Sequence, residues 1–570
     1  MKSLKNDIAE KVSAAAGVDK AQLVDLIEIP PTDEMGDLAL PCFYLSKALR
    51  KSPAAIATEL AAKIAPDDFI DRVEAKGPYL NFFLKRERVI SDVVTEISSQ
   101  KENYGKDTEG AGKTVVIDYS SPNIAKPFGI GHLRSTVIGA ALKRIFEHRG
   151  YKVIGINHLG DWGTQFGKVI LAYKLWGDEA KLAGNPIEYL YDLYVKIHQE
   201  EEKNPTLSER TREEFKKLES GDPENLALWK RFSDLSKQEF DKIYNILGIT
   251  FESLAGESFY NDKIANTEKL LTQKDLLSQS REATIVDLEI FGLQPLLIKK
   301  SDETTLYATR DLAAAIYRKE TYNFDKMLYV VGVAQSLHFR QLFKVLELLE
   351  FNWVKNCYHI SFGWVKLGEE MMSTRKGNIV FLDDVILKAI GLAKSIIEKG
   401  NPDLPDPEKT AREVGIGAVV FTDLAFRRDT DISFDWDRML DFSGNSGPYL
   451  QYSHARISSI LRKYGKPVST DYSPAELKLP EEYALAKKLS QYPDIIAKAA
   501  SDFEPFYISS FLLELCGLFN TYYQKYKSAE DRVLSVHGEK TKARLALVSS
   551  VRDVLRSGLF ILGLKAPEIM

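Results

Sequence analysis

Cysteine is scarce in this chain of 570 residues. Its three cysteines, Cys42, Cys357 and Cys516, lie far apart and form no CxxC pair. This spacing supports neither a disulfide framework nor a zinc knuckle, and it indicates a reducing compartment. The chain also lacks an apolar run near the ~20 residues of a membrane span, and its charged N-terminus differs from a secretory signal. We therefore expect a cytoplasmic protein with no membrane partner.

Positive charge is not in excess either. The formal net charge is −5 and the pI is close to 6.0, so the composition carries no global nucleic-acid signature. An RNA partner would have to meet a local basic face. Hydrophobic residues make up 44% and charged residues 28%, which is typical of globular domains with packed cores. A chain of this length has room for roughly three or four domains.

The patterning of apolar residues divides the chain into three regions. Residues 1–112 combine helical patterns with the strand-like GPYLNFFL and end in a polar, glycine-rich linker. In residues 113–446, strand-like runs alternate with amphipathic helices, which predicts an α/β domain on a parallel sheet, with a helical insertion at about 180–290. Residues 447–570 show helical patterns and predict an α-helical bundle. The predicted strands of the middle region are at 115–119, 152–159, 296–300, 327–333 and 358–365.

The stretch SPNIAKPFGIGHLRST at 121–136 links the first of these strands to a helix. Free N–H groups at a helix start favour an anion, and glycine lets a phosphate approach the backbone closely. Lys126 and His132 add side-chain donors to the same place. The stretch is not a Walker A loop, and only Gly129 and Gly131 fit a GxGxxG pattern. On these residues alone, a phosphate site and an ordinary turn both stay open.

A second loop, MMSTRKGNIVFLDDV at 371–385, also combines small and basic residues. It follows the predicted strand YHISFGWV and carries Arg375 and Lys376 beside Ser373. Such a loop next to a sheet edge suits a mobile clamp on a polyphosphate. Taken alone, it is more often a solvated turn.

Together the two loops resemble the HIGH and KMSKS elements of class I aminoacyl-tRNA synthetases. Further blocks are similar to the arginyl-tRNA synthetase family and follow in that family's order: DYSSPNIAKP, GHLRSTVIG, NHLGDWGTQFG, LYATRDLAAAIYR, GNSGPYLQYSHARI and the terminal LGLKAPEIM. The resemblance covers nearly the whole chain. It implies a tRNA-elbow (D-loop) recognition module with an α/β fold at 1–112, a class I Rossmann-like catalytic domain at 113–446 and a helical anticodon-binding domain at 447–570.

The resemblance implies an arginine–tRNA ligase. Such an enzyme activates L-arginine with ATP to arginyl-adenylate, releases pyrophosphate, and transfers the arginyl group to the 3′ end of tRNA(Arg) with release of AMP. ATP with Mg²⁺ enters as a substrate complex, and neither a tightly bound cofactor nor a protein metal site is predicted. Because this catalysis is mainly positioning and charge neutralisation, no protein nucleophile is expected. We expect a monomer.

Five residues sit where the family places its arginine contacts. A guanidinium is a planar fork of five donors, so it needs carboxylate, hydroxyl or amide acceptors. Asp118 and Asp311 are the expected charged partners, since a buried guanidinium without a counter-ion is costly. The full set is Asp118, Asn123, Tyr307, Asp311 and Gln335.

By the same resemblance, ATP lies across the start of the helix that follows the first loop. The implied catalytic residues are Lys126, His132, Arg375 and Lys376, and the implied ATP-binding residues are Pro127, Gly129, Gly131, His132, Met372 and Ser373. Two positions depart from the class I pattern. Thr374 replaces the usual second lysine of the clamp, as is common in this family, which uses a lysine before the first motif, here Lys126. Gly129 stands where the family usually has a histidine.

The flanking regions supply the implied tRNA contacts. These are Tyr79, Asn81, Tyr449, Tyr452 and Met570, with Tyr522 and Tyr526 as weaker candidates. Aromatic side chains can stack on exposed bases, although a tyrosine cluster is more often part of a core. Two alternatives stay open: a class I synthetase for another amino acid, and a non-catalytic tRNA-binding paralogue, which Gly129 makes conceivable.

Overall fold

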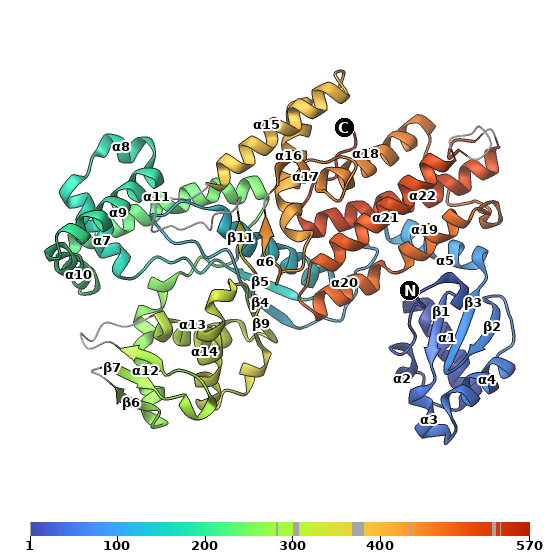
Figure 1. The fold of residues 1–570 in the computed structure, drawn as a ribbon, viewed down its shortest axis with the longest axis horizontal. Helices are drawn as coiled ribbons and strands as arrows, with labels where there is room; N and C mark the ends of the chain where they lie inside the picture. The colour runs from blue at the N-terminus through green and yellow to red at the C-terminus, as the bar shows by residue number, and fades with distance from the viewer. Residues whose placement is uncertain are drawn as a thin grey trace.

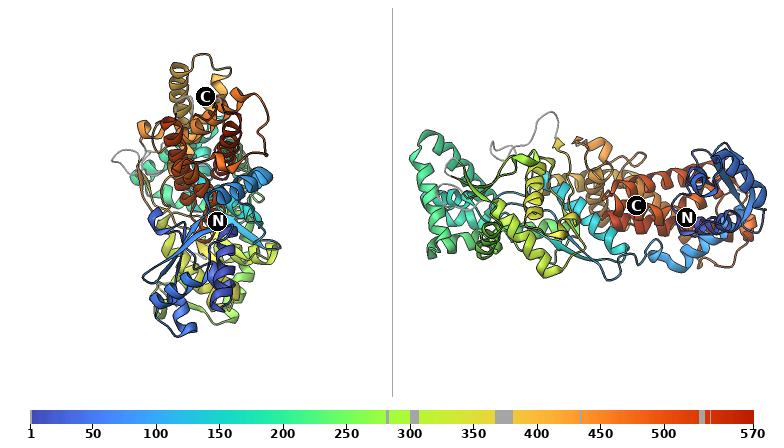
Figure 2. Two further views of the ribbon diagram at one scale, coloured as in Figure 1. Left: turned by 90° about the vertical axis from the view of Figure 1, so that its right-hand side faces the viewer. Right: turned by 90° about the horizontal axis from the view of Figure 1, so that it is seen from below.

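The computed structural model describes residues 2–280, 283–299, 307–366, 381–433, 435–526, 532–535 and 537–570. The molecule is elongated, with the N-terminal module beside the C-terminal bundle at one end and the helices of residues 164–247 at the other (Figures 1 and 2). Within the described ranges, no helix is both long enough and apolar enough to cross a membrane.

The N-terminal module is built on a three-stranded antiparallel sheet in the order β1-β3-β2. The central strand pairs Asn81 with Ala39 on one side and with Glu74 on the other. Leu80 and Phe82 alternate along this strand and are fully buried, so one face of the sheet forms the module's core. The predicted α/β module is confirmed. Its elements are α1 (Lys2–Ala16), α2 (Ala21–Val24), β1 (Leu38–Pro41), α3 (Phe43–Leu49), α4 (Pro53–Lys63), β2 (Ile70–Lys76) and β3 (Tyr79–Leu84).

A four-stranded parallel sheet in the order β10-β9-β4-β5 lies at the centre of the molecule (Figure 1). Val116 pairs with Ile154 on one side and Met327 on the other. The successive residues Val115 and Val116 point to opposite faces and are both buried, which is typical of a sheet covered on both faces. The predicted parallel α/β domain is confirmed. Its elements are β4 (Thr114–Asp118), α6 (Ile130–His148), β5 (Lys152–Ile156), β9 (Lys326–Tyr329), α14 (Ser336–Leu348) and β10 (Cys357–His359).

The predicted strand at 296–300 exists but belongs to a different sheet. Strand β8 (Leu296–Lys299) pairs antiparallel with β7 (Ala283–Val286), which pairs with β6 (Leu277–Ser280). Along β8, Leu296 is buried whereas Leu297 is 46% exposed, so only one face is covered. A strand covered on one face is typical of an antiparallel sheet. The prediction that the strand at 296–300 belongs to the parallel sheet was therefore wrong.

The insertion between β5 and β6 is mainly helical, but its helices end earlier than predicted. The predicted insertion ran to about residue 290, whereas α12 ends at Gln273 and strands β6 and β7 follow. The run ATIV at 283–286 contains β-branched residues that favour a strand, which explains the error. The helices of this part are α7 (Thr164–Trp176), α8 (Glu179–Gly184), α9 (Pro186–Lys203), α10 (Thr206–Glu219), α11 (Pro223–Leu247), α12 (Ile264–Gln273) and, after β8, α13 (Tyr307–Tyr322).

Helices dominate the C-terminal part of the chain, as predicted. Helix α5 (Arg86–Gln100) follows the N-terminal module and packs against α19 and α22, so it joins that module to the bundle. The short strands β11 (Val365–Lys366) and β12 (Ile432–Ser433) pair in parallel. The helices are α15 (Leu382–Gly400), α16 (Pro407–Leu424), α17 (Trp436–Met439), α18 (Gly447–Tyr464), α19 (Pro480–Ser490), α20 (Tyr492–Ser501), α21 (Phe506–Lys525) and α22 (Gly538–Leu562).

Candidate active site

The loop from β4 to α6 has an unusual backbone. Ser120, Ser121 and Ala125 have positive φ angles of 73°, 49° and 58°, a conformation that residues with a Cβ adopt rarely and at a cost. The loop is held from two directions: the N–H of Ala125 donates to Ser236 Oγ on α11 (3.0 Å), and the N–H of Ile124 donates to the carbonyl of Gly160 (3.1 Å). Strain of this kind, fixed by neighbouring elements, is typical of functional sites.

His132 lies in the first turn of α6, where the resemblance places a phosphate contact. Its Nδ1 accepts a hydrogen bond from the N–H of Gly129, the N-cap residue, at 3.2 Å. Burial, with a contribution from the charge of Lys126, lowers the pKa of His132 to about 4. The imidazole is therefore neutral at pH 7, and because Nδ1 is an acceptor, Nε2 carries the hydrogen and is a donor.

A cavity of about 340 Å³ lies at the start of α6. We call it the α6 cavity. Four of the predicted ATP-binding residues line it: Pro127, Gly129, Gly131 and His132. Its other walls come from the turn η5 (Val333–Gln335) after β9 and from residues 362–365, so the carboxyl ends of the sheet strands contribute to it.

A second cavity, of about 640 Å³, lies at the same end of the sheet. We call it the Asp311 cavity. It brings together four of the five predicted arginine contacts, Asp118, Asn123, Asp311 and Gln335, from different segments of the chain. Gln335 lines both cavities, so the two adjoin. The side chain of the fifth residue, Tyr307, lies outside the described part of the structure, although its backbone begins α13.

Asp311 is the carboxylate of the second cavity that interacts with two histidines. His338 Nε2 donates to Asp311 Oδ2 at 2.7 Å, and His158 Nε2 lies 3.7 Å from Oδ1. Burial raises the pKa of Asp311, but the hydrogen bond from His338 and the nearby positive charges outweigh it and lower that pKa below the ordinary value. Asp311 is therefore ionised at pH 7 and is a suitable partner for a cation.

Asp118 has a different environment from the one expected for a substrate-binding carboxylate. Its Oδ2 lies 2.9 Å from Nη1 of Arg318 on α13, both side chains are buried, and Oδ1 accepts from Ser121 Oγ at 2.9 Å. The protein itself therefore supplies the counter-ion that Asp118 requires. Asp118 remains a lining residue of the cavity, but its charge is balanced without a ligand.

The sequence analysis missed several polar residues of the Asp311 cavity. Among them is Glu257, whose pKa rises to about 8, mainly because of burial and secondly because of the charge of Asp311. The hydroxyl of Tyr329 is buried and has no hydrogen-bond partner among the described residues, which is a costly state for a buried polar group. His158 and Arg310 also line this cavity, and they fall within the quoted blocks NHLGDWGTQFG and LYATRDLAAAIYR, which was the available signal.

Lys126 lines neither cavity. Its ammonium lies 4.7 Å from the ring centroid of Tyr194 on α9, a distance typical of a cation–π contact. The structure therefore places this predicted catalytic lysine against the helical insertion. The other predicted residues of the phosphate clamp, Met372, Ser373, Arg375 and Lys376, lie outside the described residues.

The predicted tRNA contacts differ in how accessible they are. Tyr79 is 38% exposed and its ring meets that of Phe43 edge to face at 6.1 Å, whereas Asn81 is only 4% exposed within the sheet. Asn81 therefore offers little surface to a base.

In the bundle, Tyr449 and Tyr452 are half-buried on α18, and the carbonyl of Met570 accepts from Asn401 at 3.2 Å. The Tyr449 hydroxyl accepts from Asn520 at 3.1 Å, and the Arg456 guanidinium lies 4.7 Å from the Tyr452 ring. The two weaker candidates differ, since Tyr522 is a core residue at 1% exposure and the hydroxyl of Tyr526 donates to Glu481.

Three family descriptions match this chain. Residues 93–436 match the catalytic domain of class I (R) tRNA synthetases, residues 2–84 match the arginyl-tRNA synthetase N-terminal domain, and residues 450–570 match the DALR anticodon-binding domain.

Curated relatives match over their full length. The arginine–tRNA ligase of Alkaliphilus metalliredigens is 47% identical over 571 residues, covering 99% of this chain and 100% of the relative. That of Clostridium acetobutylicum is 46% identical over 567 residues, with the same coverage. Among solved structures, the arginyl-tRNA synthetase of Thermus thermophilus is similar with a TM-score of 0.84 and 26% identity, over 99% of this chain and 100% of that one.

Proposed function

This chain belongs to the arginyl-tRNA synthetase family, and we propose from this premise that it is an arginine–tRNA ligase. It activates L-arginine with ATP to arginyl-adenylate and pyrophosphate, and it transfers the arginyl group to the 3′ end of tRNA(Arg) with release of AMP. The observation that carries the proposal is the pair of adjoining cavities at the carboxyl end of the sheet, one lined by acceptors and the other by a helix start.

The Asp311 cavity is the proposed seat of arginine. A guanidinium requires acceptors in a plane, and Asp311 supplies an ionised carboxylate that two histidines hold in place. Glu257 is a second carboxyl group in the same cavity, and a bound guanidinium would favour its ionised form. Asn123, Gln335 and the hydroxyl of Tyr329, which has no hydrogen-bond partner within the described ranges, are available for the polar groups of the amino acid.

The α6 cavity is the proposed seat of ATP. The neutral His132 can donate from its Nε2–H group, and the positive end of the α6 helix dipole favours the charge of the phosphates. Because Gln335 lines both cavities, a nucleotide in one and arginine in the other would place carboxylate and α-phosphate close together. The carboxylate of arginine then attacks the α-phosphate and pyrophosphate leaves. ATP enters as its Mg²⁺ complex.

Lys126 and the clamp residues Arg375 and Lys376 are proposed to neutralise charge on the phosphates. In the present structure the Lys126 ammonium lies against Tyr194, so its proposed role requires that the side chain turn from that ring toward the nucleotide. Such a movement is within the reach of a flexible four-carbon stem.

The domain roles follow the same premise. We propose that residues 1–112 recognise the tRNA elbow, that residues 113–446 carry out the chemistry, and that residues 447–570 bind the anticodon. Tyr79 is the accessible candidate in the first of these, and Tyr449, Tyr452 and Met570 are the candidates in the last. We further propose that the protein acts as a monomer in the cytoplasm.

Amino-acid-dependent exchange of pyrophosphate into ATP tests the specificity of the proposed reaction. The purified chain is incubated with tRNA and each of the twenty amino acids in turn. Exchange is expected with arginine only. Exchange with a different amino acid would identify a synthetase of another specificity, and no exchange with any amino acid would identify a non-catalytic tRNA-binding protein.

A further inference from the structure

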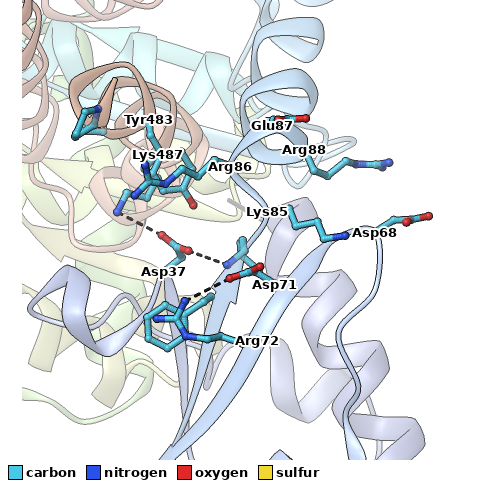
Figure 3. Close-up of a pocket in the computed structure, with 14 residues that line it drawn as sticks. Asp37, Asp68, Asp71, Arg72, Lys85, Arg86, Glu87, Arg88, Tyr483 and Lys487 are labelled. Carbon is cyan, nitrogen blue, oxygen red and sulfur yellow. Dashed lines mark hydrogen bonds and ion pairs between the residues drawn. The ribbon is translucent and has the colours of Figure 1, made fainter. Parts of the chain in front are cut away.

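A third cavity, of about 820 Å³, lies at the junction between the N-terminal module and the bundle. Figure 3 shows the charged side chains that line it, among them Asp37 and Arg72 from the module and Lys487 from α19. The chain leaves the module at Leu84, the end of β3, and enters α5 at Arg86. This cavity therefore lies beside the short connection between the module and α5.

Asp37 connects the two sides of this junction. Its N–H donates to the carbonyl of Phe82 at 2.8 Å, and its Oδ2 accepts from the N–H of Leu84 at 2.8 Å, so Asp37 is fixed to the end of β3. Its Oδ1 lies 3.3 Å from Nζ of Lys487 on α19 (Figure 3). One carboxylate thus links the last residue of the module's sheet to a helix of the bundle.

Lys487 approaches Asp37 from a defined position. Its ammonium lies 5.0 Å from the ring centroid of Tyr483, one helical turn earlier, and the guanidinium of Arg86 lies 5.3 Å from the same ring. The Lys487 and Asp37 side chains are only 19% and 13% exposed, and a partly desolvated pair interacts more strongly than a fully solvated one.

The packing around the junction makes this pair important for orientation. Helix α5 packs against α19 and α22 and is part of the bundle, whereas α1–α4 and β1–β3 make their extensive contacts with one another. The module is therefore a compact body that a short connection joins to α5. An ion pair beside such a connection can favour one angle between the module and the bundle over others.

We propose that Asp37 is a positioning residue, which through Leu84 and Lys487 fixes the angle between the N-terminal module and the bundle so that both can contact one tRNA. The inference rests on the proposed function, in which both parts bind tRNA. Two surfaces that engage one ligand gain affinity only where their geometry allows simultaneous contact. When the correct angle is only fractionally populated, the apparent dissociation constant rises by the inverse of that fraction.

The test compares Asp37→Asn and Lys487→Gln in the full chain. Each variant removes one charge of the pair and keeps a side chain of similar size. We expect either change to leave about one fifth of the molecules at the correct angle and therefore to raise the KM for tRNA about fivefold. The KM values for ATP and arginine should not change. The double variant should show no further increase, because both changes remove the same interaction.

Lys488→Gln is the matched control. Lys488 is the next residue of α19, but it pairs with Glu514 within the bundle at 2.5 Å. The angle itself is measured by the distance between spin labels at Lys47→Cys in the module and Lys463→Cys in the bundle. Both positions are exposed, and the native cysteines Cys42, Cys357 and Cys516 are buried.

The expected result is a broader or displaced label-to-label distance in Asp37→Asn and Lys487→Gln, and an unaltered one in Lys488→Gln. Unaltered distances in the first two variants would overturn the proposal, as would additive effects on the KM for tRNA. The distances do not depend on activity. If the unsubstituted protein charges no tRNA, the proposed function fails. The role of the Asp37–Lys487 pair is still tested by the label-to-label distances.

Discussion

Replacing Asp311 by asparagine removes one negative charge from the proposed arginine site and nearly preserves the shape of the side chain. A charge-assisted hydrogen bond contributes about 1.5–3 kcal/mol. At about 1.4 kcal/mol per factor of ten, its loss corresponds to a roughly 10- to 150-fold rise in the KM for arginine.

The neighbouring carboxyl group reduces this effect. The charge of Asp311 contributes to the raised pKa of Glu257, so Asp311→Asn should lower that pKa and allow more of Glu257 to ionise at pH 7. Glu257 then replaces part of the lost charge. We therefore expect a rise in the KM for arginine near the lower end of the range, about 10- to 50-fold.

The assay is arginine-dependent exchange of pyrophosphate into ATP in the presence of tRNA, with arginine and ATP varied separately. The KM for ATP should not change, because Asp311 lines only the second of the two cavities. Asp262→Asn is the control, since Asp262 pairs with Lys263 on the surface and is 77% exposed. An unchanged KM for arginine in Asp311→Asn would refute the assignment of this cavity to arginine.

Three further predictions concern the active site and the bundle. His132→Ala should slow single-turnover adenylate formation by roughly 10²–10³-fold, as the loss of a preorganised donor does. Gly129→His should change this rate little, because φ and ψ of −81° and 162° at Gly129 suit any residue. Equal effects of the two substitutions would contradict this account. The KM for arginine should fall as pH rises through about 8, because Glu257 then loses its proton and attracts the guanidinium, and Glu257→Gln should abolish this pH dependence. Tyr452→Ala should raise the KM for tRNA and leave the KM for ATP unaltered, and normal charging at limiting tRNA would count against an anticodon role.

The arrangement of the β4–α6 unit could be predicted from the sequence because local patterns determine it. A β-branched run, a glycine-containing loop and a helical repeat follow one another within 113–148, and each forms the expected element. The resemblance also predicted that Asp311 and Gln335 belong to one site, and both line one cavity although 24 positions separate them in the chain.

Other features depend on partners that local patterns do not show. The run at 296–300 predicted a strand correctly, but which strand it pairs with depends on the β6–β7 hairpin. Asp118 was expected to be a charged partner of the substrate guanidinium, but in the structure it pairs with Arg318, a residue 200 positions away. Asn81 was expected to contact tRNA, yet its neighbours in the sheet leave it 4% exposed.

The helical insertion supplies another example of a distant partner. Nothing in the 121–136 stretch indicates that the Lys126 ammonium would lie against Tyr194 of α9, because a cation–π contact between such distant segments leaves no local pattern. The raised pKa of Glu257 also depends on residues that are distant in the chain. Its value near 8 results from burial and from the charge of Asp311, which tertiary structure brings close.

Transfer of labelled arginine to the 3′ end of tRNA by the purified full-length chain tests the central claim most directly. With ATP, Mg²⁺ and a mixed tRNA pool, we expect arginine to accumulate on tRNA(Arg), with release of one AMP and one pyrophosphate for each arginine transferred, and no other amino acid to be incorporated. Incorporation of a different amino acid, or binding of tRNA(Arg) without any charging by the unsubstituted protein, would contradict the account.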